Sequence, residues 1–265
     1  MKYRLVIIVS AMLILLSHAS FGGANSLDYL IKKPRLKNEN IIGQFKDYDF
    51  SILFSGENSI YNLGYIGSNY TRIQIKLISV LQNPTNHSEY LIYGKSKVLD
   101  NICEFQGSIK ITEIRQYSPL YFGCEDEYKD KGIQFQGLLI ADYVLFENQN
   151  EKNTGYFNGK VYVAWYLDRN NKVNYDPIES CSDSWCNNQF VGYWTAYSTK
   201  KKKTCNWGQG RIPQSGDLDV GAGEFVPNAK YYDQGWEVCA KASDPFGPKD
   251  EMMKAREIEE KEWWK

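Results

Sequence analysis

Three carboxylates lie within eight residues of one another late in the chain: Asp217, Asp219 and Glu224. Paired carboxyl groups can act as general acid and base in glycoside hydrolysis. Clustered carboxylate oxygens can also bind Ca²⁺, although Gly221 stands where an EF-hand would have a third Asp or Asn. In a third interpretation Asp and Gly only shape turns, and Arg211 pairs with one of the Asp residues. The sequence favours this third interpretation and leaves calcium as the one cofactor to consider.

The later half of the chain also gathers aromatic side chains, which stack on sugar rings or line apolar pockets. Together with one arginine, they form the predicted ligand-binding set: Trp194, Trp207, Arg211, Tyr232 and Trp236. The alternative is that these rings pack a seam between the main β domain and a loop lobe.

Nucleophilic catalysis with a histidine base has little support. The chain has two histidines, His18 and His87, and the first lies in a predicted leader. His87 follows the turn signal Asn83-Pro84, so a surface position is expected for it. The net charge of −1 also argues against a nucleic-acid binder that works through bulk positive charge. A non-enzymatic protein is therefore favoured.

The N-terminus sets the expected compartment. Lys2 and Arg4 precede an apolar run from Leu5 to Leu16, which is 12 residues long. A membrane span needs about 20 residues, so this run fits a secretory signal peptide better. Cleavage after Ala19 or Ala24 would release a secreted or periplasmic protein with no remaining transmembrane span. An uncleaved signal anchor is the alternative.

Cysteines in an exported protein are expected to form disulfides, because the compartment is oxidising. The chain has six: Cys103, Cys124, Cys181, Cys186, Cys205 and Cys239. Proximity along the chain suggests pairing in that order, first with second, third with fourth and fifth with sixth. A zinc site that includes Cys181 and Cys186 is the alternative.

Alternating apolar residues predict β-strands through the middle of the chain. The alternation is cleanest at 72–77 and 160–167, and short turn signals separate such runs. The expected fold is mainly β: an antiparallel up-and-down barrel or a strongly curved β-sandwich, with a disulfide-tied loop lobe and a short C-terminal helix. The expected organisation is a signal peptide (1–24), a loosely attached leader (25–45), one β domain (46–246) that includes a Cys/Trp/Gly-rich C-terminal lobe (201–246), and a charged C-terminal helix (247–265).

A weak repeat of the form Phe-x-Gly-x-apolar supports a curved sheet. It begins at four phenylalanines: Phe105, Phe135, Phe157 and Phe190. The Phe, the Gly and the apolar residue share one face of a strand, and a glycine between large residues relieves crowding where a sheet bends.

The function expected from these patterns is an exported, non-enzymatic binding protein with its site in the C-terminal lobe. A glycan, a lipid or an envelope protein is the expected partner, and nucleic acid is not. Two alternatives stay open. One is a secreted glycan hydrolase that uses Asp217, Asp219 or Glu224, and the other is an envelope interaction protein without a small-molecule site.

Overall fold

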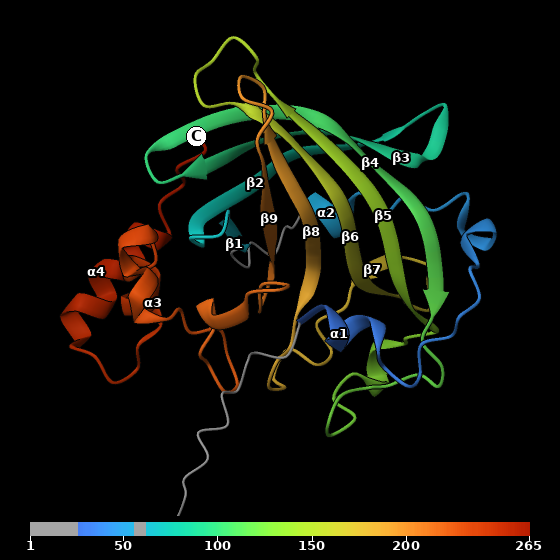
Figure 1. The fold of residues 1–265 in the computed structure, drawn as a ribbon. Helices are drawn as coiled ribbons and strands as arrows, with labels where there is room; N and C mark the ends of the chain where they lie inside the picture. The colour runs from blue at the N-terminus through green and yellow to red at the C-terminus, as the bar shows by residue number, and fades with distance from the viewer. Residues whose placement is uncertain (1–25, 56–61) are drawn as a thin grey trace, which may run out of the picture.

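One sheet of nine antiparallel strands forms most of the molecule (Figure 1). The structure is a computed structural model, and it describes residues 26–55 and 62–265. The strands are β1 (Leu63–Ile66), β2 (Thr71–Asn83), β3 (Asn86–Val98), β4 (Asn101–Gln116), β5 (Phe135–Glu147), β6 (Gly155–Leu167), β7 (Val173–Tyr175), β8 (Asn187–Ala196) and β9 (Lys202–Gln209). Their order is β5-β4-β3-β2-β1-β9-β8-β6-β7, and β5 also pairs with β6. This last pairing joins the sheet into a ring, with β7 as a short addition to β6. The predicted class, mainly β and antiparallel, is confirmed.

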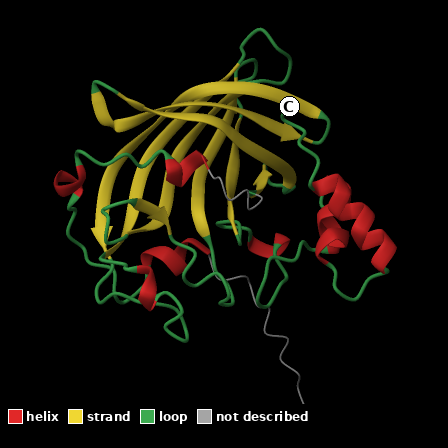
Figure 2. Ribbon diagram, turned by 180° about the vertical axis from the view of Figure 1, so that it is seen from behind, coloured by secondary structure: helices red, strands yellow, loops and turns green. Residues whose placement is uncertain are grey.

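Helices in the described residues are short and lie around the sheet (Figure 2). They are α1 (Ser26–Ile31), η1 (Ile42–Phe45), α2 (Ile52–Ser55), η2 (Lys129–Lys131), η3 (Gly216–Leu218), η4 (Ala229–Gln234), α3 (Glu237–Ser243) and α4 (Lys249–Glu259). None of the helices described has the length and apolar character needed to cross a bilayer. The predicted signal peptide, 1–24, lies outside the described residues, and export stays a prediction.

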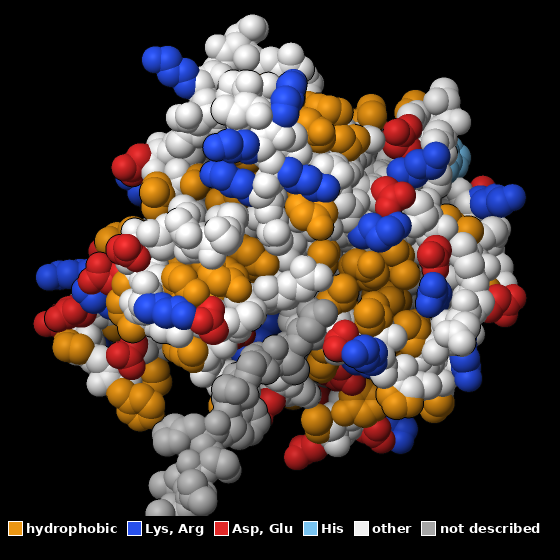
Figure 3. All heavy atoms as spheres, in the orientation of Figure 1, with side chains coloured by type: hydrophobic (Ala, Val, Ile, Leu, Met, Phe, Trp, Pro, Cys, Tyr) orange, Lys and Arg blue, Asp and Glu red, His pale blue; other side chains and the backbone are white. Residues whose placement is uncertain are grey.

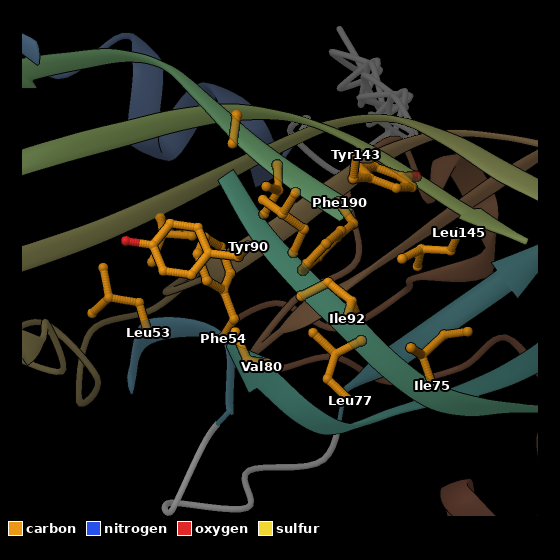
Figure 4. Close-up of a cluster of buried hydrophobic side chains, with 14 of the residues drawn as sticks. Leu53, Phe54, Ile75, Leu77, Val80, Tyr90, Ile92, Tyr143, Leu145 and Phe190 are labelled. Atoms are coloured by element: carbon orange, nitrogen blue, oxygen red, sulfur yellow. The ribbon is translucent and has the colours of Figure 1, made fainter. Parts of the chain in front are cut away.

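Alternation along the strands explains the inner face of the ring. Ile73, Ile75 and Leu77 on β2 are all buried in one large apolar cluster, as their spacing predicts. Val161 and Val163 on β6 belong to the same cluster, and they pair in register with Ala141 and Leu139 on β5. Figure 4 shows part of this interior, where side chains from β2, β3, β5, β8 and α2 meet. The interior of the ring is therefore the principal core.

Two glycines let the β6 and β8 backbones approach closely. Gly159 and Gly192, from two of the Phe-x-Gly repeats, are paired in register. A Cβ added at Gly192 would lie 2.2 Å from the backbone oxygen of Asn158 and 2.6 Å from the hydroxyl of Tyr143. The Tyr143 side chain reaches across this glycine pair, which supports the expectation that the repeat glycines relieve crowding on the inner face.

Residues 41–55, here called the strap, close one end of the ring. Phe45 and Phe50 both pack edge-on against Trp165 of β6, with ring centroids 5.3 and 4.9 Å apart. The strap is also tied to strand ends by hydrogen bonds: Ile41 N donates to the Ile114 oxygen at 2.8 Å, and Phe50 N donates to the Tyr90 hydroxyl at 2.9 Å. The last residues of the predicted leader, 41–45, are thus part of the fold.

The region of the predicted C-terminal lobe begins with a regular strand, β9, rather than a loop. Its residues from Cys205 to Gln209 are all buried. Trp207 faces the interior cluster, while Asn206 on the other face donates to the Tyr65 hydroxyl and the Pro213 oxygen. The alternation from Thr204 to Trp207 is short, and the polar Asn206 is buried on the covered outer face, so the sequence pattern did not mark a strand here.

The expected disulfides are absent, because all six cysteines are free thiols. Cys205 lies in the cluster inside the ring, whereas Cys239 lies in a separate cluster with Trp236 and Phe225. Cys103 lies near the start of β4 and Cys124 lies beyond its end. Cys186 is buried and donates to the Ser26 oxygen at 3.0 Å. Closeness along the chain was therefore a wrong guide to closeness in space.

The predicted C-terminal helix is present as α4. It is held by an ion pair in which Arg72 of β2 donates to both carboxylate oxygens of Glu259, at 2.7 and 2.5 Å. The Arg72 guanidinium also lies 5.5 Å from the centre of the Trp236 ring. The helix is thereby attached to the outside of the ring.

Candidate functional site

The five residues predicted to bind ligand do not form one surface. Trp194 and Trp207 belong to the cluster inside the ring. Trp236 is fully buried in the other cluster, where Tyr232 packs beside it, and its indole nitrogen donates to the Tyr70 oxygen at 2.7 Å. Their aromatic area is used in packing, which was the alternative interpretation of these rings.

Arg211, the fifth of these residues, holds a loop of the C-terminal lobe together. Its guanidinium donates to Asp219 Oδ2 at 2.6 Å and to the backbone oxygens of Gly221, Ala222 and Gly223 at 2.6–3.1 Å. Asp219 Oδ1 accepts the backbone N–H groups of Gly221 and Val226. The structure therefore confirms that Arg211 pairs with an Asp, and these hydrogen bonds hold the loop from Arg211 to Val226.

The other two carboxylates of the predicted calcium or catalytic set, Asp217 and Glu224, do not form a shared site with Asp219. Asp217 is exposed and interacts with Lys230 and with the Tyr231 hydroxyl. Glu224 is exposed, while both oxygens of Asp219 are occupied. Within the described residues there is no group of three or more His, Cys, Asp or Glu side chains that could hold a metal ion.

A cavity of about 430 Å³ lies instead where the strap crosses the start of β3 and the end of β4. We call it the strap cavity. Its lining residues are Ile42, Gly43, Phe45, Lys46, Asp47, Phe50, Thr85, Asn86, His87, Ser88, Ile111 and Ile114. The apolar members Phe45, Phe50, Ile111 and Ile114 are buried residues of the interior cluster, so the floor of the cavity is continuous with the core. Polar side chains from the strap and the β2–β3 turn form its rim.

The rim contains an Asp, a His and a Ser, but they do not form a catalytic triad. The Ser88 hydroxyl donates to Asn86 Oδ1 at 2.8 Å, and His87 Nδ1 lies 3.3 Å from the Lys46 backbone oxygen. A triad needs the histidine to hydrogen-bond both the nucleophile and a carboxylate. An apolar floor with a polar rim is the usual make-up of a small-molecule binding site.

No known protein family, curated protein or solved structure matches this chain.

A buried carboxylate, Glu147, lies inside the ring at the end of β5. It is 5% exposed and has no cationic partner among the described residues. Its carboxylate accepts from the Ser96 hydroxyl at 2.7 Å, the Gly155 N–H at 2.8 Å and the Trp194 indole at 2.9 Å. Burial raises the pKa of Glu147 above its ordinary value of 4.5, and the three hydrogen bonds only partly oppose this.

This raised pKa predicts a pH effect on stability. Between 4.5 and the raised value the folded protein binds a proton that the unfolded chain has lost, so the free energy of unfolding falls as pH rises. Glu147→Gln cannot ionise. Its amide oxygen can accept from Gly155 and Trp194, and its NH2 group can donate to the Ser96 hydroxyl. We expect the variant to lose less stability than the wild type between about pH 4 and about pH 7, measured by urea unfolding.

The control is Glu224→Gln, which changes an exposed carboxylate in the C-terminal lobe. Its stability should follow the wild-type pH profile. Asp176 is also buried with a raised pKa, so the wild type and both variants share that contribution. Parallel profiles for wild type and Glu147→Gln would contradict the prediction.

The sequence interpretation missed the strap cavity because it took residues 25–45 as loosely attached. Phe45, Phe50 and Phe54 are the signal that was available, since large apolar residues at such a density are seldom left in solvent. His87 is exposed, as expected, yet it lines the cavity.

Proposed function

We propose that this chain is an exported, non-enzymatic binding protein that holds a small apolar molecule in the strap cavity. The observation that carries the proposal is the cavity's floor of Phe45, Phe50, Ile111 and Ile114 beneath a polar rim. A volume of about 430 Å³ falls within the usual range for small-molecule sites. Such sites often lie at the mouths of β-barrels. The ring of strand pairings supports an up-and-down barrel whose mouth carries the strap.

Gly43 offers a direct test, because it lines the cavity and a Cβ there would meet no atom within 4 Å. Gly43→Leu adds a branched side chain to the cavity lining through a Cβ that meets no other atom. We expect Nile red, a neutral apolar dye, to bind the wild type with a rise in fluorescence, and Gly43→Leu to weaken this binding about tenfold or more.

Gly43→Ala is the matched control, because it makes the same backbone change with a single methyl group. It should bind the dye nearly as the wild type does, and thermal unfolding checks that both variants fold. Failure of the wild type to bind Nile red, or equal binding by Gly43→Leu, would refute the proposal.

A further inference from the structure

The outer face of the ring, here called its outer wall, carries a band of uncharged side chains. The band is apparent from the register of the paired strands. In one row Tyr93 pairs with Gln106, Gln106 with Phe146, Phe146 with Tyr156, and Tyr156 with Thr195, from β3 across to β8. The next row, in the same direction, is Leu91, Ser108, Val144, Asn158 and Tyr193. Residues of one row lie side by side on the same face, because partners in register point the same way. The two rows contain only aromatic, aliphatic, amide and hydroxyl side chains.

Charged residues border this band, and two ion pairs lie among them. On one side a third row runs from Glu89 through Lys110 and Asp142 to Lys160, and Lys160 donates to Asp142 at 2.7 Å. On the other side Lys95 lies 3.3 Å from Glu104. On the face that β5, β6 and β8 present in Figure 1, hydrophobic side chains lie in patches between charged ones (Figure 3). The two rows themselves therefore carry no charged side chain, although Lys202 lies at their edge with its Nζ 3.6 Å from the centre of the Tyr193 ring.

A groove of about 450 Å³ runs along this band at the end of β5, and we call it the outer-wall groove. Tyr93 and Phe146 line it, and they are 37% and 44% exposed. The lining also includes two carboxylates, Glu104, which pairs with Lys95, and the buried Glu147, so the groove is not cationic. Because β4 separates their strands, the two residues are about 10 Å apart, twice the interstrand spacing. Gln106 lies between them in the same row, and Asn148 and Gln149 of the β5–β6 loop supply further amides.

The row of rings continues beyond the groove. The Phe146 and Tyr156 ring centroids are 5.9 Å apart, and those of Tyr156 and Tyr197 are 6.0 Å apart. The ring planes in both pairs are inclined by about the same angle, 34° and 35°. An extended ligand that enters the groove would thus meet aromatic faces along a line across the wall.

We infer that the outer-wall groove binds a neutral carbohydrate chain. A sugar ring presents C–H groups on its faces and hydroxyl groups at its edges. The faces match the exposed rings of Tyr93 and Phe146, and the hydroxyl groups match the amides of Gln106, Asn148 and Gln149. Nucleic acids and acidic polysaccharides would require a cationic groove. A lipid chain would require a continuous apolar lining, which the amides interrupt. This site is separate from the strap cavity, so either can fail without the other.

The test is affinity electrophoresis through gels that contain glucan, mannan, galactan or xylan, with alginate as the acidic comparison. We expect at least one neutral polysaccharide to retard the wild type. Tyr93→Ala and Phe146→Ala should each weaken the binding about tenfold, and the double variant should abolish it. Both side chains are exposed, so the variants should fold, and thermal unfolding checks this.

Leu91→Ala is the matched control, since Leu91 is 48% exposed in the neighbouring row but does not line the groove. It should be retarded as the wild type is. The inference is overturned if no neutral polysaccharide retards the protein, if only alginate does, or if Leu91→Ala loses as much binding as Phe146→Ala. A dimer in sedimentation that disappears in Phe146→Ala would assign the band to self-association and would also overturn it.

Discussion

Replacement of Arg211 by methionine is expected to lower the free energy of unfolding by about 3–5 kcal/mol. Arg211 is 6% exposed and Asp219 is 3% exposed, so loss of the guanidinium leaves a buried carboxylate without its counter-ion. Three backbone oxygens in the segment from Gly221 to Gly223 also lose their donor. Each unsatisfied buried acceptor adds its own desolvation cost.

Urea unfolding of Arg211→Met and Arg211→Lys measures this effect. Lysine keeps the charge but lacks the planar fork that reaches several oxygens at once, so we expect it to recover only part of the loss. The control is Lys230→Met, which breaks the exposed ion pair with Asp217 and should leave the unfolding midpoint unchanged. Equal midpoints for Arg211→Met and Lys230→Met would show that the Arg211 interactions do not stabilise the lobe.

In the C-terminal lobe, the cysteine pattern was a misleading guide to the interactions that hold the loop. Six cysteines suggested covalent ties, yet the interaction that shapes the loop is between Arg211 and Asp219, eight residues apart. Such an ion pair depends on the path of the loop between its partners, because that path decides whether the backbone oxygens converge on the guanidinium. The spacing of Arg211 and Asp219 in the sequence can suggest that they pair, but it does not predict the conformation of the loop between them.

Strands were predictable where one face is buried and the other meets solvent. Ile73, Ile75 and Leu77 alternate with polar residues, so β2 was found from its period alone. The period is too short to mark β9, which is covered on both faces, and it does not describe the strap, whose phenylalanines enter the ring from two short helices and the segment between them. In both places tertiary packing, rather than local pattern, decides which residues are buried.

Candidate binding residues were harder to predict than strands for a related reason. Residue type identified Trp194 and Trp236 as stacking groups, but type does not tell an exposed ring from a packed one. Tyr93 and Phe146 are 53 residues apart, and each is only one outward position on its own strand. They enter one row through the register of β3, β4 and β5, which is non-local information.

Trp207→Ala is the second substitution expected to have a large effect, a loss of about 3–5 kcal/mol in the free energy of unfolding. Trp207 is 1% exposed and stacks on Phe190, with ring centroids 4.6 Å apart and planes inclined by 14°. Tyr143 and Phe157 contact it edge-on at 5.3 and 6.0 Å. Truncation would leave a cavity among rigid rings from several strands, and such rings cannot collapse into the space without moving the sheet.

The matched control is Trp263→Ala, because Trp263 is only partly buried and lies beyond α4, close to the C-terminus. Its effect on urea unfolding should be small. Trp207→Phe should fall between the two, since a ring can still stack on Phe190 while less volume is lost. An unfolding midpoint for Trp207→Ala equal to that of Trp263→Ala would mean that the interior is not packed around Trp207. The indole would then again be a candidate for ligand stacking, because a ring that binds ligand is usually dispensable for folding whereas a packed ring is not.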